Sequence, residues 1–247
     1  MNATKWRVFN ANTIKFLACA LMVIDHIGLL FFPEEQIWRA IGRLSMPLFA
    51  FAIAEGCRYT RNKCKHLLLP FLLALVCQIV YYFFDNGSLY MCILVTFSLS
   101  IVTIYALQNF KTALFTTDDT SDKVLSGILF ALTVFCVYAL NQVLTIDYGF
   151  WGCMTPVFAS LCDFHGLPAP AVLKKLDNVP VRALCMAVPL CLIPAFGGFG
   201  KISYFALLAI PLLFLYNEKK GRLKTKYFFY LFYPLHLVLL QAIATFL

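Results

Sequence analysis

Two adjacent ionisable residues, Asp25 and His26, interrupt an apolar run that is long enough to cross a lipid bilayer. The run, TIKFLACALMVIDHIGLLFF, covers residues 13–32, and roughly 20 helical residues span the hydrocarbon core. An ionisable side chain at this depth is costly and is most often found where a substrate, an ion or a proton is handled. Imidazole can accept or donate a proton near neutral pH. We therefore expect Asp25 and His26 to belong to a site within the membrane.

The next apolar run supplies a cation at a matching depth. Asp25 lies about seven residues before the turn FPEEQ, or roughly 10 Å below it, and Arg43 lies about as far beyond it. On neighbouring antiparallel helices the two residues would be level, which predicts an ion pair between them. Arg39 shares a helix face with Arg43, so Asp25, the turn acids Glu34 and Glu35, or a bound anion must balance two cations. A purely structural pair that joins the two helices is the alternative interpretation.

Other polar positions in the apolar runs also have both a functional and a structural interpretation. His236, in YFFYLFYPLHLVLL, also lies near the predicted midplane. It is either a second catalytic or acceptor-binding group or a hydrogen-bonding residue beside a kink at Pro234. For His26, too, an interhelical hydrogen bond is the structural alternative. Glu55 and Arg58 lie three residues apart on one helix face, which predicts a structural ion pair.

The composition indicates an integral membrane protein. Of the 247 residues, 62% are hydrophobic and only 13% are charged, which is too little polar surface to cover a soluble globule. The net charge of +8 comes from short basic clusters between apolar runs, so we expect the lipid bilayer, and no nucleic acid, as the partner of these clusters. The ten cysteines form no CxxC pair and lie mostly in apolar runs. We interpret them as small core residues and expect no metal site.

The apolar runs predict an all-α fold, a polytopic integral membrane helix bundle of about nine transmembrane helices. The predicted spans are residues 14–32, 37–58, 66–84, 90–109, 124–144, 149–163, 181–196, 202–216 and 227–246. The sixth and eighth are short, so eight spans remain an alternative. Nine spans with a cytoplasmic N-terminus place most of the 20 lysines and arginines on the cytoplasmic side, as the positive-inside rule requires. We expect one domain, residues 1–247, in the cytoplasmic membrane of the cell.

Five segments of the chain carry a family resemblance: VIDHIG, IGRLSMPLFAFAIAEGCRYTRN, DYGFWG, PLLFLYN and KYFFYLFYPLHLVLL. In these segments, and in their order, the chain resembles the TraX family of multi-spanning membrane proteins. TraX proteins are associated with conjugative transfer and with N-terminal acetylation of pilin. The family is similar to a wider superfamily of transmembrane acyltransferases that includes the lysosomal enzyme acetylating heparan sulfate glucosamine. There, a membrane-embedded histidine on an early helix is implicated in moving an acetyl group from cytoplasmic acetyl-CoA across the bilayer. The resemblance thus implies this role for His26, with Asp25 beside it.

Acyl transfer from a thioester needs a base, a donor that stabilises the developing oxyanion, and a dry site. His26 has the chemistry of the base, and Arg43 or a helix dipole could stabilise the oxyanion. In a variant mechanism, His26 or His236 carries the acetyl group covalently. The sequence leaves both routes open.

The acyl donor, acetyl-CoA, would arrive from the cytoplasm. The segment RYTRNKCKH places Arg58, Arg61, Lys63 and Lys65 where they could bind the CoA phosphates. Contact with lipid headgroups, together with the positive-inside signal, is the alternative explanation for this cluster.

The predicted function is transfer of an acetyl (acyl) group to an amine or hydroxyl acceptor at the outer side of the membrane. The acceptor would be a peptide N-terminus such as that of pilin, or a sugar. Two other classes remain alternatives: a proton-coupled membrane transporter and a non-catalytic membrane assembly protein. A transporter commonly shows two related halves, and the sequence contains no visible internal repeat.

Overall fold

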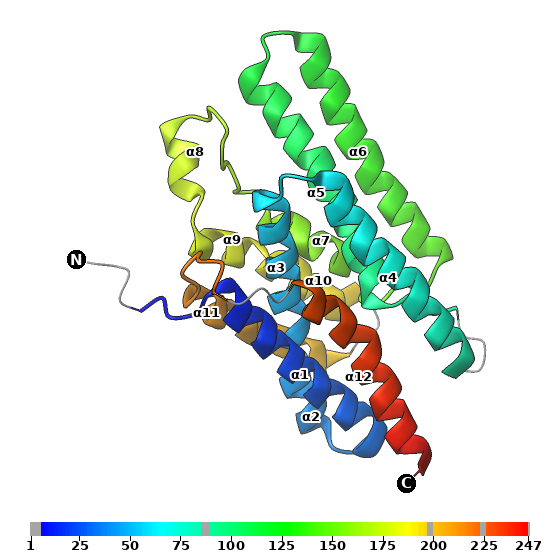
Figure 1. Ribbon diagram of the computed structural model, residues 1–247. Helices are drawn as coiled ribbons and strands as arrows, with labels where there is room; N and C mark the ends of the chain where they lie inside the picture. The colour runs from blue at the N-terminus through cyan, green and yellow to red at the C-terminus, as the bar shows by residue number, and fades with distance from the viewer. Residues whose placement is uncertain (1–5, 85–88, 197–199, 223–225, 247) are drawn as a thin grey trace.

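The computed structural model describes residues 6–84, 89–196, 200–222 and 226–246, and it is built from helices (Figure 1). In chain order these are α1 (Ala11–Phe31), α2 (Gln36–Gly42), α3 (Ser45–Tyr59), α4 (Lys63–Phe84), α5 (Ile93–Thr116), α6 (Thr120–Val143), α7 (Gly149–Ala159), α8 (Ala171–Leu176), α9 (Val179–Cys185), α10 (Ala187–Phe196), the 3₁₀ helix η1 (Lys201–Leu208), α11 (Ala209–Phe214) and α12 (Lys226–Phe246). Within the described ranges, β pairing is limited to isolated bridges. The all-α prediction is confirmed.

Five helical stretches among the described residues are long and apolar enough to cross a membrane. They are Ala11–Phe31, Gln36–Tyr59, Ile93–Thr116, Thr120–Val143 and Val179–Phe196. The protein is therefore a multi-pass membrane protein, whereas the count of nine spans and the cytoplasmic N-terminus stay predictions. The predicted span 149–163 contains α7, which has 11 residues. At 1.5 Å per residue that is roughly 16 Å, about half of the hydrocarbon thickness.

Proline residues break several of the predicted spans into shorter helices. Proline has no N–H, and its ring collides with the carbonyl group four residues earlier. Pro47 lies four residues after Arg43, where α2 gives way to α3, so the run predicted as one helix over 37–58 is two helices. Pro189 and Pro211 stand in a similar relation to the breaks between α9 and α10 and between η1 and α11. Broken helices of this kind line binding sites in other membrane proteins.

Helices α1 and α12 lie side by side and run in the same direction (Figure 1). Near their starts, the rings of Phe16 and Phe229 are 5.0 Å apart, and further along, the rings of His26 and His236 are also 5.0 Å apart. A first and a last helix that run parallel fit an odd number of crossings. We call the end of the bundle at which α1 begins the inner end, after the predicted orientation, and the opposite end the outer end.

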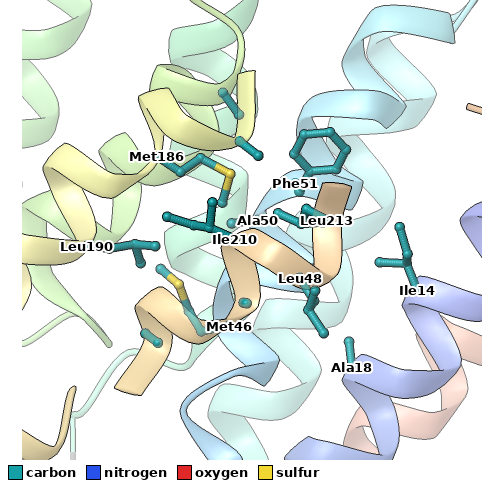
Figure 2. Packing of buried hydrophobic residues seen from close by; sticks show 14 of the residues in the cluster. Ile14, Ala18, Met46, Leu48, Ala50, Phe51, Met186, Leu190, Ile210 and Leu213 are labelled. Atoms are coloured by element: carbon teal, nitrogen blue, oxygen red, sulfur yellow. The ribbon is translucent and has the colours of Figure 1, made fainter. Parts of the chain in front are cut away.

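The largest group of buried apolar side chains joins α1 and α3 to the helices that follow α8 (Figure 2). Ala18 of α1 and Leu48 and Phe51 of α3 are buried there, together with Leu190 of α10 and Leu213 of α11. Small residues on α1 allow close approach of α3, which is how helices usually pack in lipid. This core fixes α1, which carries Asp25 and His26, relative to α3, which supplies part of the apolar lining of the site.

Buried ion pairs at the inner end correct the predicted pair between Glu55 and Arg58. Glu55 Oε1 accepts a hydrogen bond from Arg182 Nη1 at 2.5 Å, and Arg182 is fully buried. Arg58 instead donates to Asp163 Oδ1, at 2.9 Å, and to Asp177 Oδ1. The prediction was wrong because segments more than 100 residues away in sequence supply carboxylate and guanidinium partners within the core, where an unpaired charge would be costly.

Lys111 of α5 holds the inner end of α7. Its buried ammonium group donates to the carbonyl oxygens of Ser160 and Leu161, at 2.7 Å each, and to that of Asp163 at 2.9 Å. The last carbonyls of a helix have no partner within the helix, and a cation at this end also complements the helix dipole. Lys111 therefore anchors the C-terminal cap of α7 and the loop that follows it to α5.

Candidate functional site

An elongated cavity of about 410 Å³ runs through the bundle along one face of α1. On α1 the lining side chains recur every three or four residues, from Lys15 near the inner end to Leu29 near the outer end. This is the repeat of one helix face, and it extends over roughly 21 Å. The remaining walls come from α2, α3, α4, α12, the start of α5 and the turn before α7. The cavity thus connects groups near the two ends of the bundle.

The middle of the cavity is apolar and the outer end is polar. Met22, Met46, Phe49 and Phe97 are among the residues that line the middle. The polar residues of the outer end are Asp25, His26, Arg39, Arg43, Tyr90, Asp147 and Tyr148. A site of this kind excludes water around its reacting groups and strengthens their electrostatic interactions.

Asp25 forms its ion pair with Arg39, so the predicted pair with Arg43 was wrong. Arg39 Nη1 donates to Asp25 Oδ2 at 2.7 Å. The physical reason is the close contact of α1 and α2 at Gly42, where a Cβ atom would lie 2.3 Å from Cβ of Asp25. Arg39, one turn before this contact, lies within reach of the carboxylate, whereas Arg43 follows the end of α2 and turns to Tyr148. The second oxygen of Asp25, Oδ1, is buried and has no hydrogen-bond partner among the described residues.

His26 and His236 lie edge to face, with ring centroids 5.0 Å apart and an interplanar angle of 72°. Nδ1 of His26 lies 2.9 Å from the carbonyl oxygen of Met22, and Nδ1 of His236 lies 3.0 Å from that of Phe232. A carbonyl oxygen can only accept, so in each ring Nδ1 carries the hydrogen. In a neutral ring Nε2 then keeps its lone pair. His26 lines the cavity, whereas His236 is buried and is absent from the lining.

The turn before α7 brings Asp147 and Tyr148 into the cavity, and sequence reasoning did not single them out. Tyr148 has a φ of 59°, which is rare for a bulky residue and costs roughly 1–3 kcal/mol. Gly149 follows with a φ of 61°, and Gly152 leaves room that a Cβ atom would take, 2.4 Å from Cβ of Tyr148. The glycines of DYGFWG therefore permit this conformation. The two glycines that closely follow Asp147 and Tyr148 were the signal in the sequence that could have identified this turn.

Tyr148 and Asp147 are both tied to neighbouring polar groups. Arg43 Nη1 donates to the Tyr148 hydroxyl oxygen at 3.0 Å, and the Tyr90 hydroxyl donates to Asp147 Oδ1 at 2.6 Å. Burial raises the pKa of Tyr148 to about 12, although nearby Arg43 opposes this shift, so the phenol is protonated at neutral pH. Burial also raises the pKa of Asp147 to about 6, against the hydrogen bond from Tyr90, so this carboxyl is mostly ionised at pH 7.

His66 lines the inner end of the cavity and was likewise missed. Its ring lies against Gly56, where a Cβ atom would be 2.6 Å from Nε2 of His66. Its Nδ1 lies 2.9 Å from the hydroxyl oxygen of Tyr105. Gly56 thus lets α3 approach the first turn of α4, where His66 is located.

The predicted donor-binding residues separate into two environments. Arg61, Lys63 and Lys65 are exposed in the connection from α3 to α4 and in the first turn of α4. The side chain of Arg58 is 8% exposed and is paired with two aspartates. Arg58 is therefore already paired with carboxylates. The three exposed cations are accessible to an anion from the inner side, and the ammonium of Lys63 also lies 5.1 Å from the ring centroid of Tyr105.

Comparison with known proteins agrees with the family resemblance. A family model described as TraX protein matches residues 10–244. The probable fimbrial assembly protein FimC, serogroup H1, of Dichelobacter nodosus is 26% identical over 267 aligned residues, which cover 97% of each chain. The uncharacterized protein RP591 of Rickettsia prowazekii (strain Madrid E) is 34% identical over 102 residues, 41% of this chain and 39% of its own. No solved structure matches. Because the family model spans nearly the whole sequence, the chain belongs to the TraX family.

Proposed function

We propose that this protein is a membrane acetyltransferase that moves an acetyl group from acetyl-CoA, at the inner side, to an amine acceptor at the outer side. The observation that carries the proposal is the position of His26, whose ring lines a cavity that also reaches Lys15 and His66 near the inner end. A thioester arm entering from the inner side and a nucleophile entering from the outer side could meet at this ring. The apolar middle of the cavity suits the uncharged arm of such a donor.

The two histidines have different roles in this proposal. His26 contacts the substrates, as the base that deprotonates the acceptor amine or as the nucleophile that carries the acetyl group. His236, behind it, is a positioning residue that orients the His26 ring. The Arg39 and Asp25 pair fixes α2 against α1, and Arg43 faces the developing negative charge. The exposed cations Arg61, Lys63 and Lys65, but not Arg58, are proposed to meet the CoA phosphates.

Family membership and the name of one relative favour a peptide acceptor. TraX proteins are associated with pilin acetylation, and the relative from Dichelobacter nodosus is named a probable fimbrial assembly protein. We therefore propose that the acceptor is the N-terminal amine of a pilin-like peptide in the cytoplasmic membrane. The same relative's name also supports the second candidate, a non-catalytic role in pilus assembly.

The test is acetyl transfer by the purified, detergent-solubilised protein. Labelled acetyl-CoA is incubated with peptides that have a free or a blocked N-terminus and with amino sugars. We expect transfer to the free peptide amine and a loss of at least roughly 100-fold in His26→Gln. His165→Gln is the matched control, because His165 is exposed at the inner end away from the cavity. Transfer that survives in His26→Gln, or no transfer to any acceptor, contradicts the proposal.

A second measurement separates the two routes. If His26 carries the acetyl group, label remains on the protein when no acceptor is present and leaves when the acceptor is added. Direct transfer leaves the protein unlabelled at every stage.

A further inference from the structure

The backbone at Tyr148 is held in an unfavourable conformation by contacts on several sides. The hydroxyl of Thr96 donates to the carbonyl oxygen of Asp147 at 2.7 Å, and the amide of Gly152 donates to that of Tyr148 at 3.0 Å. The amide of Asp147 donates to the carbonyl oxygen of Met91 at 2.9 Å. Strain that the surrounding structure maintains in this way is typical of functional positions.

This backbone conformation places the phenol of Tyr148 beside the guanidinium of Arg43 at the outer end of the cavity. Tyr148, Arg43 and His26 all line that end. Arg43 is buried, donates through Nη1 to the phenol oxygen at 3.0 Å, and has a buried Nε without a hydrogen-bond partner among the described residues. A phenol whose oxygen accepts a hydrogen bond can still donate its own hydrogen to another acceptor.

We propose that Tyr148 is a catalytic residue that, together with Arg43, stabilises the oxyanion of the acyl-transfer step. This inference rests on the proposed acetyltransferase function. The nucleophile, either the acceptor amine or the His26 imidazole, forms a bond to the thioester carbonyl carbon. The electron pair of the C=O double bond moves to the oxygen, which accepts hydrogen bonds from the Tyr148 hydroxyl and from a guanidinium N–H of Arg43.

Collapse of this tetrahedral species re-forms the carbonyl and breaks the C–S bond. In direct transfer, the departing thiolate takes the proton that His26 removed from the amine, so an amine and a thioester yield an amide and a thiol. The oxyanion forms in both routes, so the role of Tyr148 is the same in each. The bond between Arg43 and Tyr148 orients the phenol and makes its hydrogen a stronger donor.

The experiment is Tyr148→Phe, which removes the hydroxyl and keeps the ring. Loss of one oxyanion donor lowers kcat by roughly 100- to 1,000-fold, and KM for acetyl-CoA should change little. Tyr138→Phe is the matched control. Tyr138 of α6 is an exposed tyrosine whose ring packs on Phe150 of α7, the helix that Tyr148 precedes. Thermal unfolding of both variants should match that of the wild type within a few degrees, which separates catalysis from folding.

A second set of variants tests whether the two donors act together. Arg43→Lys keeps the charge but loses the guanidinium geometry, and the double variant should be scarcely slower than the slower single variant. A Tyr148→Phe protein with unchanged kcat, or with a defect confined to KM, overturns this inference while the wild type still transfers acetyl groups. A wild type without transfer activity overturns the proposed function itself, and this inference with it.

Discussion

Asp25 shows how much a single side chain's partner depends on local backbone geometry. A double-mutant cycle can test whether Asp25 pairs with Arg39 rather than with Arg43, because it measures the coupling free energy of each pair. In Asp25→Asn combined with Arg39→Gln, the two effects on unfolding free energy should couple by about 1–3 kcal/mol. The coupling between Asp25→Asn and Arg43→Gln should be smaller, because Arg43 bonds to Tyr148. Unfolding of each variant in detergent provides the values, and a larger coupling with Arg43 would refute the pairing observed here.

The sequence indicated which polar residues gather toward the outer end of the bundle and was less informative about their hydrogen-bond partners. Asp25, His26, Arg43 and His236 were predicted from charge and depth in apolar runs, and His26 and His236 prove to be neighbours. The Arg39 pairing could not be predicted, because it depends on the break after α2 and on close packing at Gly42. The position of a residue along its helix predicts its depth in the membrane. Which residue it contacts depends on how each helix is rotated about its own axis.

At the scale of helices, α7 illustrates a short element that needs support from outside itself. Lys111→Met replaces the ammonium with an apolar end of similar length. It leaves the carbonyls of Leu161 and Asp163, just beyond the end of α7, without their donor, whereas that of Ser160 still accepts from the amide of Asp163. We expect a loss of about 2–4 kcal/mol in stability, because each unpaired buried carbonyl costs about 1–3 kcal/mol. Thermal unfolding measures the loss. Lys175→Met, at an exposed position in α8, is the control and should leave the melting temperature nearly unchanged.

Helix boundaries were predicted where hydropathy changes and were missed where proline breaks a uniformly apolar run. The starts of α4 and α6 lie a few residues before the predicted starts at 66 and 124, and α6 ends at Val143, next to its predicted end at 144. The breaks after Gly42 and Cys185 lie inside apolar runs, where average hydropathy carries no signal. Pro47 and Pro189 were the available signals, because each removes a donor and crowds the carbonyl four residues earlier.

For the whole molecule, the sequence predicts which end of the helix bundle faces the cytoplasm, which the arrangement of the helices alone does not specify. The distribution of lysine and arginine predicts that the connection between α3 and α4 lies in the cytoplasm and that the start of η1 lies outside. Cys64 is exposed in the first turn of α4, and Lys201 is exposed at the start of η1. Five predicted spans separate these two positions, so they should lie on opposite sides of the membrane.

A membrane-impermeant maleimide tests this arrangement directly. Cys64 should react in inverted vesicles and not in intact spheroplasts, and the signal should disappear in Cys64→Ser. In a Cys64→Ser, Lys201→Cys protein, the new thiol should react in intact spheroplasts. Labelling of both positions from one side would mean that one of the five predicted spans does not cross the membrane. The span that contains α7 would be the first candidate, because α7 is only roughly 16 Å long.

Reaction of Cys64 from outside would reverse the bundle and place the polar end of the cavity, with His26, toward the cytoplasm. The acceptor would then have to be a cytoplasmic amine, since the carboxylates and arginines that surround His26 would face that compartment.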